Sequence, residues 1–132
     1  MKRKQEGKLK EPPLQPLRTP TGWLVQWNTF FDVEPNFGSY DQISWNFGED
    51  MLLVSNERVG IAIALGWHPA YRSPGMFQMV AARIYEDEDK SIASWDAPLR
   101  KLRTRSREKI VGTLERWMEW YGNQKSRSQK KR

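Results

Sequence analysis

The sequence predicts an α+β fold: a single antiparallel sheet of about five to six strands with a C-terminal amphipathic helix packed on one face. Short apolar segments separated by Gly, Pro, Asn and Asp recur between residues 23 and 95, which is typical of strands joined by turns. One apolar stripe at helical spacing follows between residues 110 and 121. Residues 23–122 are numerous enough to enclose one hydrophobic core, so we expect one domain.

The first strand is expected over residues 23–31, because bulky side chains recur there at every second position. The alternating residues, which would share one face, are Trp23, Val25, Trp27, Thr29, Phe31 and Val33. Turn residues at 35–38 end this strand. A second strand is expected over residues 40–47, where Ile43, Trp45 and Phe47 alternate.

A hairpin is expected next, with strands over 51–55 and 59–67 joined around residues 56–58. The second of these strands is apolar throughout, which predicts a central position with both faces covered. Its small residues share one face, against which a helix can pack closely; they are Gly60, Ala62, Ala64 and Gly66. Two further strands are expected over 76–85 and 91–95, on either side of an acidic turn at 86–90.

The closing helix is predicted from apolar residues at i, i+1, i+4, i+7, i+8 and i+11, which are Ile110, Val111, Leu114, Trp117, Met118 and Tyr121. Thr104 or Ser106 can cap its start. Gly122 is placed to end it.

Charge is segregated along the chain, whose formal net charge is +6. Residues 1–22 carry a net +4 and residues 123–132 a net +5, which leaves −3 for residues 23–122. Within that part, residues 23–89 sum to −7 and residues 90–122 to +4. We expect a disordered or extended basic arm over 1–22, the folded domain over 23–122 and a disordered basic tail over 123–132. The arm is interpreted as either a phosphate-binding or a solubilising segment.

The composition excludes several kinds of chemistry. The absence of cysteine rules out disulfides, thiolate metal sites and a cysteine nucleophile. His68 is the single histidine, and no spacing of serine and acid around it indicates a catalytic triad. Neither a Gly-rich dinucleotide loop nor a Walker motif occurs. We therefore expect a protein that is not an enzyme and has no cofactor or metal.

No apolar run reaches the ~18 residues of a membrane span, and the basic start is not followed by the apolar stretch of a secretory signal. We therefore expect a cytoplasmic location and no membrane partner.

Carboxylates gather in three places. Asp32 and Glu34 flank Val33 and so share a strand face, while Glu49 and Asp50 fall in a turn. Either pair can imitate a hydrolase acid/base pair or a magnesium site, although turn acids are common without such a role. The acidic run 86–89 lacks the glycine and the final glutamate of an EF-hand loop. A protein-binding surface is the role that we expect for these acids.

A basic cluster crosses the expected start of the helix and consists of Arg100, Lys101, Arg103, Arg105, Arg107 and Lys109. Cations are unfavourable at this end of the helix dipole. Bound phosphate, acidic residues of the same protein or a partner can each offset that cost. An alternative function follows from the first of these: a nucleic-acid-binding accessory protein that uses the basic tails with Arg100, Lys101, Arg103, Arg105 and Arg107.

Four segments are distributed over about residues 23–121: the opening GWLVQWNTFFDVEP, the acidic turn FGEDMLL, the segment GIAIALGWHP and the closing helix IVGTLERWMEWY. In general form the chain resembles the small immunity proteins of bacterial polymorphic-toxin and contact-dependent growth inhibition systems. That resemblance implies a single cytoplasmic α+β domain that binds a toxin without cofactor or catalysis, and it transfers no residue roles. The basic tails depart from the usual acidic balance of nuclease-blocking immunity proteins, which leaves the kind of toxin open.

We therefore expect a non-enzymatic immunity protein that neutralises a cognate toxin, or binds another basic protein, through an acidic, aromatic-bearing surface. Exposed rings in that surface would slow release of the partner. The residues expected to bind the partner are Asp32, Glu34, Glu49, Asp50, Trp67, His68, Tyr71, Glu86, Asp87, Glu88 and Asp89.

Overall fold

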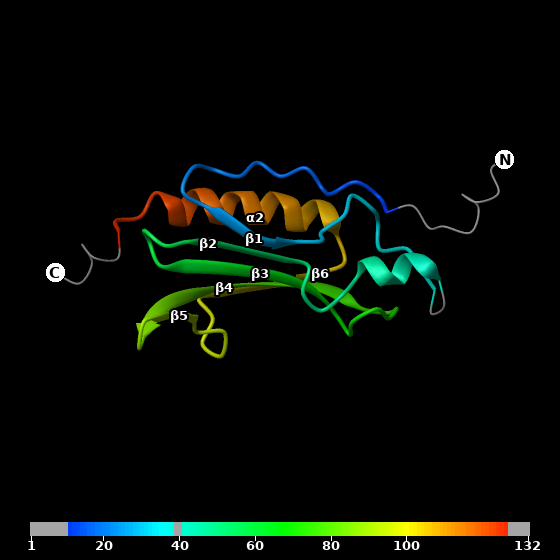
Figure 1. Cartoon of the computed structure of the whole chain (residues 1–132). Coiled ribbons are helices and arrows are strands. Elements are labelled where there is room, and N and C mark those ends of the chain that lie inside the picture. Colours follow the sequence, from blue (N-terminus) through cyan, green and yellow to red (C-terminus); the bar gives the residue numbers. More distant parts are fainter. Residues whose placement is uncertain (1–10, 39–40, 127–132) are drawn as a thin grey trace.

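The computed structural model describes residues 11–38 and 41–126 and confirms the predicted α+β class (Figure 1). The elements are, in chain order, β1 (Leu24–Asn28), the 3-10 helix η1 (Gln42–Asn46), β2 (Leu52–Asn56), β3 (Ile61–His68), β4 (Met76–Asp87), β5 (Lys90–Ala93), β6 (Arg100–Thr104) and α2 (Arg107–Gly122). The strands form one antiparallel sheet, and α2 lies across one of its faces.

The sheet follows chain order from β1 to β4, with the predicted hairpin formed by β2 and β3. β4 is the longest strand, with 12 residues, and two short strands share its far edge. β6 pairs with residues 77–81 and β5 with residues 84–87. Residues 94–99 connect β5 to β6 and loop away from the edge of β4. The chain rejoins that edge where the amide of Leu99 donates to the carbonyl of Ala81 at 2.8 Å.

The hydrophobic core lies between α2 and the side of the sheet that bears the bulky residues of β3 and β4. α2 buries Ile110, Leu114, Trp117, Met118 and Tyr121, in agreement with the predicted stripe. On the sheet, Ile63, Trp67 and Phe77 are completely buried. The rings of Trp67 and Phe77 meet edge to face with centroids 5.1 Å apart, an orientation that aromatic pairs favour.

The expectation that a helix packs on the small residues of β3 is wrong. Ala62 and Ala64 alternate with Ile61, Ile63 and Leu65, and the core with α2 is built from the bulky set. Large interlocking side chains remove more apolar surface from water than small ones can. On the small side, Gly66 instead admits the backbone of the segment before β2, since a Cβ there would lie 1.8 Å from the carbonyl oxygen of Glu49.

The strand expected over 40–47 is wrong where the chain is described, because residues 42–46 form the 3-10 helix η1. The carboxylate of Asp41 accepts from the amide of Ile43 at 3.3 Å, a local bond that competes with strand pairing. The turn places Ser44 and Phe47 in the interior and leaves Trp45 exposed. Residues 39 and 40 lie outside the described residues.

The first strand is shorter than the predicted 23–31, and its face pattern is broken. β1 covers Leu24–Asn28, and its register with β2 shifts between Val25 and Trp27. Val25 and Trp27 are exposed, whereas Trp23 and Phe31 are buried. β1 is the edge strand of the sheet, and none of its five residues is buried.

The basic cluster does not lie wholly at the helix start, which corrects the sequence prediction. Residues 100–104 form β6, a strand that the sequence did not indicate, and the helix begins at Arg107. The open edge of β4 explains this, because its amides and carbonyls need partners. Ser106 caps α2 as predicted, with its hydroxyl accepting from the amide of Lys109 at 3.0 Å.

The described part of the expected arm, residues 11–22, runs along the domain (Figure 1). Leu14 forms an isolated bridge with Phe31, and Leu17 packs against the core. The amide of Arg18 donates to the carboxylate of Glu115 at 2.7 Å, which ties this segment to α2. Residues 1–10 of the arm and 127–132 of the tail lie outside the described residues. Across the described ranges, no helix is both long and apolar enough to cross a membrane.

Gly66→Ala is expected to lower the free energy of unfolding by about 1–3 kcal/mol, because the added methyl group overlaps the Glu49 carbonyl. Gly38→Ala is the matched control, since a Cβ at Gly38 meets nothing within 4 Å. Chemical denaturation measures both variants. Equal stability of the two would contradict the close packing described at Gly66.

Candidate functional site

Three large rings are exposed where η1 and the start of β2 meet the loop after β3. Trp45 is 70% exposed, Trp27 52% and Tyr71 46%. Trp45 and Tyr71 lean against each other with ring centroids 5.6 Å apart. Such grouping differs from the single scattered apolar residues found on most protein surfaces.

The backbone holds this group in place. The amide of Tyr71 donates to the carbonyl of Phe47 at 2.8 Å, so the loop after β3 is joined to the end of η1. Tyr71 adopts a φ of 62°, a left-handed conformation that is unfavourable for a side chain of this size. The Tyr71 ring lies over Gly48, where an added Cβ would come within 3.2 Å of its hydroxyl oxygen.

Two of the predicted carboxylates belong to the same surface. Glu49 and Asp50 are exposed and immediately precede β2, and the indole of Trp27 donates to the carbonyl oxygen of Asp50 at 2.9 Å. Among the described residues, neither carboxylate is joined to a cation by an ion pair. We call Trp27, Trp45, Glu49, Asp50 and Tyr71 the aromatic–acidic surface.

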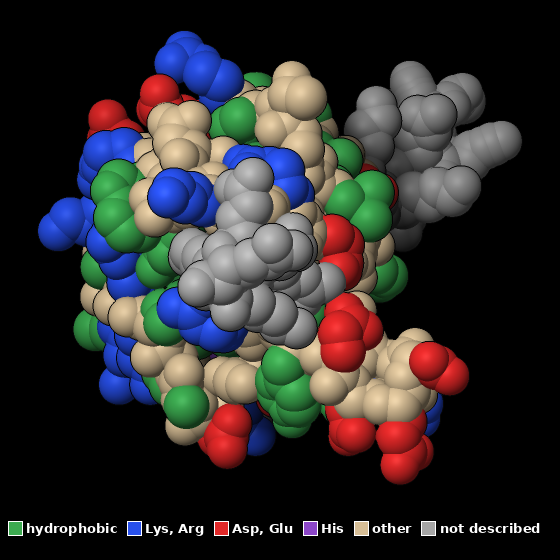
Figure 2. All heavy atoms as spheres, turned by 90° about the vertical axis from the view of Figure 1, so that its left-hand side faces the viewer, with side chains coloured by type: hydrophobic (Ala, Val, Ile, Leu, Met, Phe, Trp, Pro, Cys, Tyr) green, Lys and Arg blue, Asp and Glu red, His purple; other side chains and the backbone are tan. Residues whose placement is uncertain are grey.

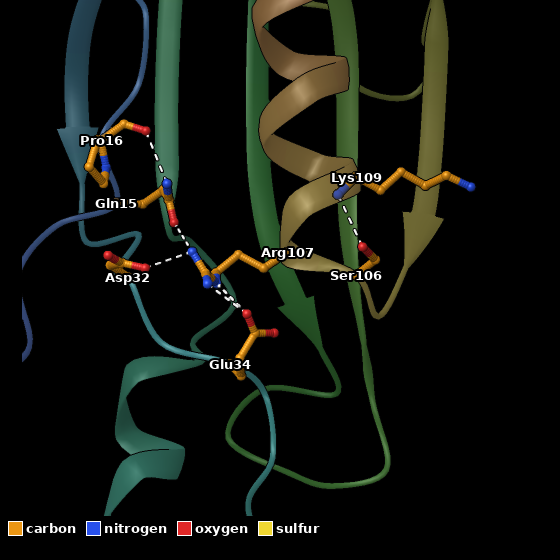
Figure 3. A network of polar contacts seen from close by, with 7 residues as sticks. All are labelled: Gln15, Pro16, Asp32, Glu34, Ser106, Arg107 and Lys109. Carbon is orange, nitrogen blue, oxygen red and sulfur yellow. Dashed lines mark hydrogen bonds and ion pairs between the residues drawn. The ribbon is translucent and has the colours of Figure 1, made fainter.

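Asp32 and Glu34 are occupied by an arginine of the same chain (Figure 3). The guanidinium of Arg107, at the start of α2, lies 2.7 Å from the carboxylate of Asp32 and 2.6 Å from that of Glu34. The same group donates to the side-chain oxygen of Gln15. Of the three explanations for cations at the helix start, intramolecular neutralisation therefore accounts for Arg107.

Trp67 and His68 differ in their access to solvent. Trp67 is fully buried and its indole donates to the carbonyl of Arg72 at 2.7 Å, so its ring belongs to the core and not to the surface. His68 is half-buried at the end of β3.

The remaining predicted acids lie at the opposite end of the sheet. Residues 86–89 form the tip of the β4–β5 hairpin, where Glu88 and Asp89 turn the chain with positive φ. From the registers of β2, β3 and β4, Asp50 lies level with Phe77, so this tip is about 30–35 Å along the strands from it. The structure therefore brings Glu49, Asp50 and Tyr71 together but separates them from residues 86–89.

The basic cluster is also divided in space. Arg100 lies over the rings of Trp120 and Tyr121, whereas Lys101 and Arg103 alternate with it along β6 and so project to the other side of the sheet. Arg105 donates to the carbonyl of Gly75 at 2.7 Å. Figure 2, which views the end where α2 finishes, shows Lys and Arg gathered on one side and Asp and Glu at another.

The sequence prediction missed Trp27 and Trp45, because both were assigned to a strand face. Asp41 is the residue of the sequence that indicates a helical turn over residues 42–46 in place of a strand, because its carboxylate can cap such a turn. It also missed Trp120, which lies 50% exposed outside the apolar stripe of α2. The spacing of four residues between Arg116 and Trp120 places both on one side of the helix, and this spacing can be read from the sequence.

The described residues contain no group of three His, Asp or Glu side chains arranged to hold a metal ion. Comparison with known proteins adds no relative: no family model, no curated protein and no solved structure matches the chain. The geometry of the chain itself is therefore the basis for a functional proposal.

Arg107→Ala is expected to lower the free energy of unfolding by about 1–2 kcal/mol, because it leaves Asp32 and Glu34 without their shared partner. This loss of stability is small because the Glu34 side chain is 57% exposed, so water replaces part of the lost interaction. Arg103→Ala, which removes the same charge from an exposed position on β6, should change stability by less than about 0.5 kcal/mol. Urea denaturation of both variants tests this, and indistinguishable curves would show that the Arg107 contacts do not stabilise the fold.

Proposed function

We propose that this chain is a non-enzymatic protein-binding protein whose aromatic–acidic surface binds a basic protein. The particular role proposed is that of an immunity protein that neutralises a cognate bacterial toxin. The observation that supports it most is the grouping of three exposed rings with two carboxylates that no described cation neutralises.

The rings would supply the affinity. Trp and Tyr are over-represented among the residues that dominate binding at protein interfaces, because each buries a large area when a partner covers it. Trp45 is the most exposed of the large hydrophobic residues in the described chain, and it lies beside Tyr71. Covering this pair would remove from water the rings that the fold itself leaves uncovered.

The carboxylates would supply selectivity and speed. Asp32 and Glu34 are held by Arg107, so the charge presented to a partner comes mainly from Glu49 and Asp50. Negative charges beside an apolar surface attract a basic partner over a distance and oppose an acidic one. We therefore expect the partner to bind at the end of the sheet that carries the aromatic–acidic surface. Residues 86–89, at the other end, are expected to lie outside the contact.

The charge-reversed variant E49K/D50K is expected to slow association with the partner about tenfold at low salt, because long-range attraction becomes repulsion. Its dissociation rate should change less, since the rings are intact. The measurement is the binding kinetics of the protein encoded beside this chain, after co-expression establishes a 1:1 complex that resists moderate salt.

The matched control is D87K/E88K, which reverses the same number of charges at the hairpin tip. It should associate at nearly the wild-type rate. Equal slowing by both variants would show that net charge alone governs association, and unchanged kinetics for E49K/D50K would remove this surface from the interface.

A further inference from the structure

A second surface, near the end of α2, has the opposite charge. Two adjoining hollows lie between the last turns of the helix and the edge of the sheet formed by β4 and β6. The larger, of about 440 Å³, is lined by residues that include Thr113 and Arg116, and the smaller, of about 210 Å³, by residues that include Arg83 and Tyr121. Arg100 and Trp120 line both hollows, and we call the two together the Arg–Trp groove.

Trp120 is held in the groove without being covered. The guanidinium of Arg100 lies 4.8 Å from the centre of its ring, and the ring of Tyr121 meets it edge to face at 5.0 Å. Half of the Trp120 side chain still remains exposed. The fold therefore presents an oriented aromatic surface in a hollow, with a cation already beside it.

Positive charge predominates along the groove. Arg83, Arg100 and Arg116 line it, and within the described residues none of them forms an ion pair with a carboxylate. Glu119 is the acid in the same lining, so three cations face one anion. Arg58, outside the lining, donates to the carbonyls of Gly122 and Gln124, so it is Arg58 that satisfies the negative end of the helix.

We infer that the Arg–Trp groove is a binding site for single-stranded nucleic acid, distinct from the aromatic–acidic surface. The three guanidinium groups match the repeated phosphates of such a strand, and Trp120 offers a ring on which an unpaired base can stack. Bases of a duplex are stacked on each other and cannot use that ring.

The test measures fluorescence anisotropy of a labelled oligothymidine of about 12 nucleotides with the full-length chain, between 50 and 200 mM salt. Three phosphate contacts predict that the logarithm of affinity falls with the logarithm of salt with a slope of about −2, and Arg100→Ala should reduce the slope by about 0.7. Trp120→Ala should weaken binding about 5- to 150-fold with little change in slope, and Trp120→Phe should restore most of the loss.

Two matched controls test whether any loss of binding is specific to the groove, since they remove an arginine and an exposed tryptophan that lie elsewhere on the surface. Arg103→Ala removes a charge from the same strand as Arg100 but from the other side of the sheet, and Trp45→Ala removes an exposed ring at the far end. Both should bind within about twofold of wild type, and circular dichroism confirms that all variants are folded. The inference is overturned by the absence of binding at 50 mM salt, by equal binding of a duplex together with no effect of Trp120→Ala, or by equal losses in Arg100→Ala and Arg103→Ala.

Discussion

The packing of α2 against the bulky side of β3 and β4 holds the domain together and positions both of its candidate sites. It buries Leu114 and Met118 of the helix against Ile63 and Phe77 of the sheet, and burial of each such side chain contributes about 1.5–3 kcal/mol. The indole of Trp23 donates to the carbonyl of Met118 at 2.9 Å, which fastens the chain before β1 to the same helix. This packing fixes the position of both ends of α2. The first end forms ion pairs with acids of the same chain, and the last turns meet Arg100 of β6.

At the start of α2, Arg107 reaches Asp32 and Glu34 and removes two acids from the charge available to a partner. Near its end, Trp120 meets Arg100 of β6, and a groove with three arginines opens beside them. The acidic half and the basic half of the sequence are thus not two separate layers in space. Arg107 of the basic part forms ion pairs with two acids of the acidic part. Elsewhere the two kinds of charge lie apart, so the aromatic–acidic surface and the cationic groove occupy opposite ends of one small domain.

Periodicity in the sequence predicts the elements whose side chains pack in regular alternation. The β2–β3 hairpin, most of β4 and the buried stripe of α2 follow directly from apolar spacing. The elements that it could not predict are those decided by local hydrogen bonds or by an open strand edge: the Asp41 carboxylate turns residues 42–46, and the edge of β4 recruits residues 100–104. The candidate sites share this difficulty. Glu49, Asp50 and Tyr71 were expected and lie together, whereas apolar periodicity alone does not reveal Trp45 and Trp120, which the core leaves uncovered.

The rings at the two ends of the domain are expected to serve different partners, and NMR of the indole N–H groups in isotope-labelled protein can distinguish them. Trp23 and Trp67 donate to backbone carbonyls in or beside the core, so their signals serve as internal references. On titration with oligothymidine, the Trp120 signal should move while the signals of Trp27 and Trp45 remain in place. Movement of the Trp45 signal together with Trp120, or in its stead, would contradict the division of the surface described here.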